Sequence, residues 1–210
     1  KGEIGDGTMA SSDNMSKALD KAYKSPNLKA LILRINSPGG SPVQADYMFN
    51  LLKYYRQQYP KTMVYAVCTE SCASAAYYVA AAADKIYANP ASIVGSIGVV
   101  YNGFGFDELM KKFGVSRRLM IAGKNKAMMD PFSPVNPEQK ILMQKMIDEI
   151  HQQFIAKVKE GRGERLKIDD ETFSGLPWTG QDALARGLID GFGSTGDLIR
   201  QVIKVDDVVD

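Results

Sequence analysis

A run of small apolar residues constrains this chain more than any other stretch. The run begins near Cys72 and continues through Ala83, where the charged pair Asp84-Lys85 follows. Alanine is the best helix former, and the run contains neither Gly nor Pro, so we expect a helix. Because this helix is apolar on every side and too short to span a membrane, we place it in a protein core. The preceding apolar run at 63–68 is typical of a buried strand.

Ser74 would lie in the first turn of this helix. Backbone N–H groups in a first turn have no intrahelical partner, and the helix dipole is positive there. A serine nucleophile requires such donors beside it to stabilise an oxyanion. Spacing alone favours a simpler interpretation, in which a small polar residue caps or packs at the helix start. Other residues must decide between the two.

Strands alternate with helices along the chain, which is typical of an α/β fold with a largely parallel core sheet. We expect one domain over residues 1–210. The chain opens at Lys1 without a methionine, so we expect a piece of a longer protein whose first strand begins upstream. The expected strands are 28–35, 63–68, 85–88, 93–100, 116–121 and 188–190, and the other expected helices are 12–24, 42–55, 107–113, 137–160, 180–186 and 195–203.

A glycine loop follows the strand at 28–35. In Asn36-Ser37-Pro38-Gly39-Gly40-Ser41, the proline fixes the turn, and the two glycines allow backbone conformations that other residues avoid. One interpretation is a plain turn from strand to helix. The other is a loop that offers N–H groups to a carbonyl oxygen or pairs with a peptide.

Composition excludes several classes of function. Apolar residues make up 45% and charged residues 24% of the chain, as in an ordinary soluble globular protein. The net charge of +2 gives no reason to expect a nucleic-acid partner. We interpret Cys68 and Cys72 as packing residues, and with a single histidine there is little material for a zinc site. No metal and no cofactor is expected.

A serine hydrolase also needs a general base. The histidine, His151, lies in the middle of a polar helix, so a Ser-His-Asp triad is not expected. Lysine can fill this role where desolvation removes its proton near neutral pH. Lys126 is the best candidate, because apolar residues bound its segment, and Lys124 and Lys85 remain alternatives. Lys85 is also explained as a cation at a helix C-terminus.

Together these motifs resemble the signal peptide peptidase A family, the serine peptidases of the ClpP/crotonase fold. The resemblance covers nearly the whole chain, in the family's order, and implies an α/β ClpP/crotonase-like core with a largely parallel sheet and flanking helices. The motifs that carry it are Asn36-Ser37-Pro38-Gly39-Gly40, Ala73-Ser74-Ala75-Ala76-Tyr77-Tyr78, Ala82-Ala83-Asp84-Lys85-Ile86, Gly95-Ser96-Ile97-Gly98-Val99, Gly123-Lys124-Asn125-Lys126, and the late run 178–190.

The resemblance also implies roles for individual residues. Ser74 would be the nucleophile and Lys126 the general base, with Ser96 holding the lysine amine in place. The oxyanion hole would be formed by the N–H of Ala75 and by that of Gly39 or Gly40.

The chain departs from the family's pattern at two places. Ala75-Ala76 stands where the family usually has Gly-Gly, and we expect the added methyl groups to narrow the pocket. Ala127 stands where the family has an acidic residue after the lysine.

From the family we expect a membrane-anchored endopeptidase whose N-terminal anchor lies upstream of this chain and whose catalytic domain faces the periplasm or the cell exterior. Its partners would be peptide substrates, signal-peptide remnants and other apolar or unfolded peptides, and copies of itself in an oligomer that shares active sites between protomers. Two alternatives belong to other classes: a crotonase-like acyl-CoA enzyme, which needs no serine nucleophile, and a non-catalytic scaffold domain in which Ser74 is only structural.

Overall fold

Strand β2 (Met63–Ala73) is the centre of a six-stranded sheet. Its apolar first half is buried, as the sequence predicts for a core strand. It pairs in parallel with β1 (Ala30–Ser37), with β3 (Lys85–Ala88) through its first half, and with β4 (Ile93–Gly95) through its last three residues. The predicted, largely parallel sheet is therefore present in the structure. The computed structural model describes residues 1–205 and 208.

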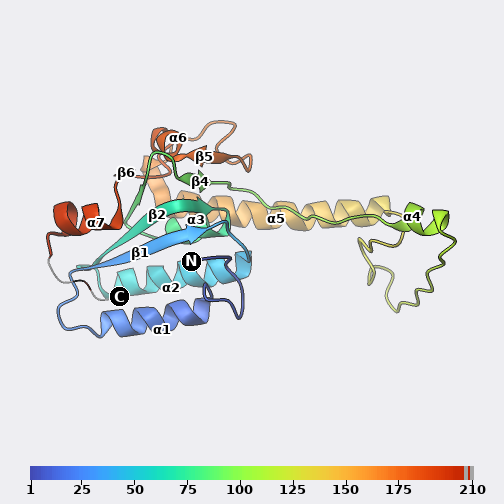
Figure 1. Cartoon of the computed structure of the whole chain (residues 1–210), viewed down its shortest axis with the longest axis horizontal. Coiled ribbons are helices and arrows are strands. Elements are labelled where there is room, and N and C mark those ends of the chain that lie inside the picture. The colour runs from blue at the N-terminus through green and yellow to red at the C-terminus, as the bar shows by residue number, and fades with distance from the viewer. Residues whose placement is uncertain (206–207, 209–210) are drawn as a thin grey trace. The chain divides into compact units, whose positions relative to one another are not determined.

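Two amphipathic helices lie along each other beside β1 (Figure 1). They are α1 (Ser12–Tyr23) and α2 (Pro42–Gln58), and each begins at a serine whose hydroxyl accepts a backbone N–H, as N-caps do. The buried residues of α2 recur every three or four positions, so one face of the helix joins the core.

Helix α3 (Ala75–Ala80) is buried at every residue, which confirms the predicted core helix. Its predicted start near Cys72 was wrong, since β2 continues to Ala73 and Ser74 lies between the two elements. The reason is strand pairing: Cys72 and Ala73 pair with Val94 and Gly95 of β4.

The C-terminal part of the chain completes the sheet. A short strand that the sequence pattern did not predict, β5 (Pro177–Thr179), pairs antiparallel with β4. The strand predicted at 188–190 lies slightly later, as β6 (Gly191–Phe192), which pairs in parallel with β3. The remaining elements of this part are η1 (Gly163–Arg165), α6 (Gly180–Ala185), α7 (Thr195–Asp197) and η2 (Leu198–Ile203).

An ion-pair network fixes this part of the chain. Arg162 is only 1% exposed, and its guanidinium donates to Gly187 O at 2.9 Å and to Asp190 Oδ2 at 2.8 Å. Asp190 also accepts the N–H of Ile86 at 2.7 Å and an Arg165 N–H at 3.3 Å. Burial alone would raise the pKa of Asp190, but these hydrogen bonds and arginine charges outweigh it and lower that pKa.

The chain divides into two units. The first comprises Lys1–Gly98 and Gln153–Asp210, and the second is Val99–Gln152. The second unit contains α4 (Asp107–Lys112) and the beginning of α5 (Pro137–Arg162), which ends in the first unit. The strand predicted at 116–121 is not formed. No residue of the second unit is buried, whereas the first unit holds the hydrophobic core.

Candidate active site

Ser74 occupies the turn between β2 and α3. Its backbone has φ 53° and ψ −128°, a conformation that non-glycine residues rarely adopt. The turn is held by three hydrogen bonds: the Ser74 N–H donates to Gly95 O at 2.7 Å, and the Ser74 carbonyl accepts from Tyr77 N at 2.9 Å and Tyr78 N at 3.1 Å. Nucleophiles that must reach a substrate often lie on a strained strand-to-helix turn, which exposes their side chain. Ser74 is partly exposed, whereas the residues on either side of it are buried.

The tyrosines that follow Ser74 hold α3 in place. The hydroxyl of Tyr77 donates to Leu188 O at 2.7 Å, and that of Tyr78 donates to Asp46 Oδ1 at 2.9 Å. Burial raises the pKa of the Tyr77 phenol, so it remains a donor at any physiological pH. The helix behind the nucleophile candidate is therefore rigidly attached to the core.

The glycine loop lies directly against the Ser74 turn. A Cβ built on Gly39 would be 2.7 Å from Ser74 Cβ and 3.1 Å from Ala75 N. A Cβ on Gly40 would be 2.1 Å from the carbonyl oxygen of Ile4. Both glycines also have positive φ, 116° and 137°. Side chains are thus excluded at both positions, and the loop backbone approaches the nucleophile candidate closely.

Two backbone donors beside Ser74 are free. The N–H of Gly39 donates to Ser37 Oγ at 3.2 Å, and the Gly39 carbonyl accepts from Ile4 N at 2.8 Å. In a trans peptide the C=O and N–H point in opposite directions, so the N–H of Gly40 points away from Ile4. Within residues 1–205 and 208, neither this N–H nor that of Ala75 has a hydrogen-bond acceptor. The structure therefore distinguishes Gly40 from Gly39 as a free donor.

Ser96 lies at the same edge of the sheet as Ser74. Ala73 and Gly95 are partners in the parallel β2–β4 pair. Ser74 and Ser96, which directly follow these two residues, therefore lie next to each other where the two strands end. Ser96 also has a positive φ, 51°, and its N–H donates to Leu176 O at 3.0 Å.

The three lysine candidates lie in different places. Lys85 begins β3, where it pairs with Tyr65 near the start of β2, roughly 30 Å along the strand from Ser74. Its amine is 3.6 Å from Asp190, so it serves the ion-pair network. Lys124 and Lys126 belong to the second unit and are exposed, and Lys126 N donates to Gly123 O in a turn.

The hydroxyl of Ser74 has no hydrogen-bond partner in the part of the chain that the structure describes. The first unit therefore places a nucleophile candidate, a second serine and two donors together, but no base in contact with that hydroxyl. His151, like Lys126, lies in the second unit.

Ala75 and Ala76, whose methyl groups we expect to narrow the pocket, are both buried, at 5% and 0% exposure, and belong to the core cluster. The narrowing itself stays a prediction. Sequence reasoning also gave no role to Ser37, although a buried polar residue inside a glycine loop is a usable signal.

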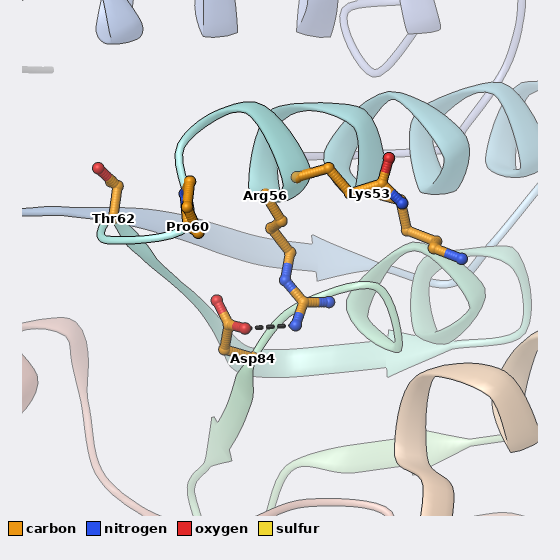
Figure 2. Close-up of a pocket in the computed structure, with 6 residues that line it drawn as sticks. Lys53, Arg56, Pro60, Thr62 and Asp84 are labelled. Carbon is orange, nitrogen blue, oxygen red and sulfur yellow. Dashed lines mark hydrogen bonds and ion pairs between the residues drawn. The ribbon is translucent and has the colours of Figure 1, made fainter.

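A pocket of about 340 Å³ lies elsewhere, at the edge of the sheet where β2 and β3 begin. Figure 2 shows Arg56 reaching from α2 to the carboxylate of Asp84, with which it forms an ion pair. Arg56 also donates to Ala82 O at 2.6 Å, and Asp84 accepts from Val64 N at 2.8 Å. These contacts join chain segments of the core, and the pocket is remote from Ser74. Its lining residues are Lys53, Arg56, Gln57, Pro60, Thr62 and Asp84.

Residues 1–205 and 208 contain no cluster of three His, Cys, Asp or Glu side chains suited to a metal ion. None of the helices in this described part of the chain is long and apolar enough to cross a bilayer.

The model of peptidase family S49 matches residues 56–208. The chain is 43% identical over 183 residues to a protein of Brucella abortus (strain 2308) named Na(+)/H(+) antiporter NhaA, covering 87% of this chain and 25% of that protein. It is 32% identical over 188 residues to the chloroplastic serine protease SPPA of Arabidopsis thaliana, covering 89% of this chain and 27% of that one. The chain thus spans about a quarter of the length of these relatives.

Solved structures show the same fold. A serine-to-alanine variant of the 1510-N membrane-bound stomatin-specific protease superposes with a TM-score of 0.56 at 20% identity, covering 95% of this chain and 79% of that one. A lysine-to-alanine variant of the same protease, in complex with a substrate peptide, gives a TM-score of 0.54. This likeness confirms the predicted α/β fold with a mostly parallel sheet and flanking helices.

Proposed function

The chain belongs to peptidase family S49, and on this premise we propose that it is the catalytic part of a serine endopeptidase. Ser74 is its nucleophile and Lys126 its general base. The observation that carries the proposal is the Ser74 turn, a strained junction of β2 and α3 with two free backbone donors, those of Ala75 and Gly40, close to it. The substrates are apolar or unfolded peptides, signal-peptide remnants among them, as the resemblance to the signal peptide peptidase A family implies.

The reaction proceeds in two halves. Neutral Lys126 takes the proton of Ser74 as Oγ attacks the peptide carbonyl, and the protonated lysine then gives that proton to the leaving amine. The acyl-enzyme is released by water, which the same lysine activates. Ser96 holds the lysine amine in line with Ser74, since both serines leave the sheet at one edge.

The oxyanion hole is assigned to the N–H groups of Gly40 and Ala75. Both are backbone donors without an acceptor in the described residues, and both lie on segments that contact Ser74. They are fixed before substrate arrives, so they stabilise the tetrahedral intermediate without reorganising. Loss of one such donor raises the barrier by about 3–4 kcal/mol.

The base reaches Ser74 in an assembled oligomer. Lys126 is exposed on a unit that buries no residue, and a lysine loses its proton near neutral pH only when it is desolvated. Fifteen large apolar side chains of the second unit are exposed, among them Phe104, Phe113 and Met120. A second copy of the chain, which carries the same apolar surface, covers them and Lys126 together. The membrane anchor lies in a part of the protein outside this chain, and the catalytic part faces the periplasm or the cell exterior.

Hydrolysis of fluorogenic casein tests the dyad. We expect the Ser74→Ala and Lys126→Ala variants to be inactive, and Lys124→Ala, a matched change two residues away, to keep its activity. Between about pH 6 and pH 10 the activity of the wild type should rise as a lysine loses its proton. Full activity of Lys126→Ala would show that another residue is the base. Inactivity of the wild type would favour the scaffold or the acyl-CoA enzyme.

A mixing experiment tests whether the base comes from a neighbouring copy. Ser74→Ala keeps Lys126, and Lys126→Ala keeps Ser74, so a mixed oligomer contains complete sites only if the two residues meet between protomers. We expect a mixture of the two inactive variants to regain part of the wild-type rate. An inactive mixture that has exchanged subunits would restrict the base to the same protomer.

A further inference from the structure

Ser37 is a buried polar residue in the glycine loop. It ends β1, and its exposed fraction is 4%. Within the described residues, its hydroxyl forms hydrogen bonds with Gly39 alone. Ser37 Oγ accepts the N–H of Gly39 at 3.2 Å and lies 3.4 Å from the Gly39 carbonyl oxygen, to which it can donate. A buried hydroxyl needs hydrogen-bond partners, and both of these come from Gly39.

The loop is attached on both sides of this contact. Ser71, in β2, donates its hydroxyl to Ser37 O at 3.1 Å, and its N–H donates to Asn36 Oδ1 at 3.2 Å. On the far side, Ile4 N donates to Gly39 O and Ser41 N donates to Ile4 O, both at 2.8 Å. Between these anchors, the Ser37 hydroxyl is the group that fixes the peptide joining Pro38 to Gly39.

This contact has a consequence for the two glycine amides. With its N–H committed to Ser37, Gly39 has no proton to offer a ligand. Gly40 keeps a free N–H, which points away from Ile4 because its own peptide carbonyl, Gly39 O, is bonded there. If the Ser37 hydroxyl were removed, the Gly39 N–H would be buried without a partner, and the peptide could rotate to satisfy it.

We propose that Ser37 is a positioning residue that makes Gly40, and not Gly39, the glycine donor of the oxyanion hole. This role rests on the proposed peptidase function, because it concerns the oxyanion of that reaction. Ser37 does not touch the substrate. It acts through Gly39. Its hydroxyl accepts the Gly39 N–H and lies within donating distance of Gly39 O, which belongs to the same peptide group as the Gly40 N–H.

Amide hydrogen exchange tests the geometry without any activity. In a 15N spectrum of the whole chain, the Gly39 amide should exchange slowly and the Gly40 amide fast, by at least about tenfold. In Ser37→Ala the Gly39 amide should lose its protection. Equal exchange of the two amides in the wild type would overturn the proposal, even if the variant fails to fold.

Kinetics test the consequence for catalysis, and Ser11→Ala is a matched control. Ser11 is 5% exposed, and its hydroxyl accepts the Asn14 N–H at 3.3 Å at the start of α1. We expect Ser37→Ala to lower kcat by about 10- to 100-fold with KM within twofold, because the lost alignment affects the transition state alone. Ser11→Ala should keep kcat within twofold of the wild type.

The outcomes separate this role from the proposed function. Equal kcat values for Ser37→Ala and Ser11→Ala, in an active wild type, would overturn the role of Ser37 and leave the dyad intact. A wild type that neither cleaves casein nor reacts with a fluorophosphonate at Ser74 would overturn the peptidase proposal and this role with it.

Discussion

The two units of this chain differ in where their apolar side chains lie: the first unit buries them, and the second exposes them. The first unit packs its alanines, tyrosines and branched residues around β2 and α3, so that Ala76, Tyr77 and Phe49 are fully buried. The second unit, Val99–Gln152, buries none of its residues and exposes side chains such as Phe113 at 74% and Met120 at 95%. Apolar composition alone therefore does not create a core. The first unit has a sheet whose strands hold the apolar faces together, and the second has no strand in its described residues.

This difference separates the two halves of the proposed chemistry. Ser74 and the free donors belong to the unit with its own core, where backbone strain at Ser74 can be held by packing and hydrogen bonds. Lys126 belongs to the second unit, whose large apolar side chains are exposed. In the proposed mechanism, each chain already holds Ser74 in its reactive geometry, and Lys126 becomes an effective base only when copies of the chain associate.

The largest expected effect compares one phenylalanine from each unit. Phe49→Ala should lower the free energy of unfolding by about 3–5 kcal/mol, because it leaves a cavity in the core. Phe113→Ala should change the unfolding of a dilute, monomeric sample by less than about 0.5 kcal/mol. Urea unfolding measures both changes. Similar losses for the two variants would show that the second unit has a core of its own.

A negative charge introduced into each unit tests which unit mediates self-association. Met120→Asp should weaken self-association at least tenfold, about 1.4 kcal/mol, because the carboxylate would be buried without a partner in the interface. Met9→Asp places the same charge on a methionine of the first unit that is 88% exposed, and should leave association unchanged. Sedimentation equilibrium gives the association constants of both variants. If the two changes weakened association equally, the second unit would not be the surface through which the chain self-associates.

Acid should weaken the first unit through Asp190. Its pKa is lowered by its arginine partners in the folded state, so its contribution to stability is complete above the unfolded value of about 3.9 and disappears as the pH falls through the lower folded value. We expect the free energy of unfolding to fall below about pH 4, and to fall less steeply in Asp190→Asn. This is a smaller effect than the two above, and urea unfolding between about pH 2.5 and 5 measures it. An equally steep fall of the free energy of unfolding with pH in Asp190→Asn would contradict this role of Asp190.

Much of the fold was predictable where a local signal decides the structure. The strand at Lys85–Ala88 lies where its pattern predicts, and the long helix begins at Pro137, after an asparagine whose side chain accepts the N–H of Glu138 at 2.9 Å. The buried Ala-rich helix and the glycine loop were also readable, because composition and turn chemistry are local properties.

The errors occurred where partners distant in sequence decide. Local propensity predicted a helix from Cys72, but pairing with β4 keeps Cys72 and Ala73 in a strand. The β-like segment 116–121 has no strand beside it in the described residues and stays irregular. The strand at Pro177–Thr179 was missed because it is short, begins with proline and forms only against β4.

The candidate site follows the same division. Sequence motifs selected Ser74, Ser96 and the two glycines, and the structure brings them to one region of the first unit. Sequence could not choose between Gly39 and Gly40, because that choice depends on how Ser37 and Ile4 bond the loop. The lysine remains a prediction from its motif.

The rate at which a fluorophosphonate labels Ser74 tests the central claim most directly. Labelling needs an activated serine and the oxyanion donors, but no particular peptide. We predict fast labelling of the wild type and of Lys124→Ala, and labelling at least about 100-fold slower in Lys126→Ala, because a general base supplies a factor of this size. Labelling of Lys126→Ala at the wild-type rate would contradict the claim that the second unit supplies the base to Ser74.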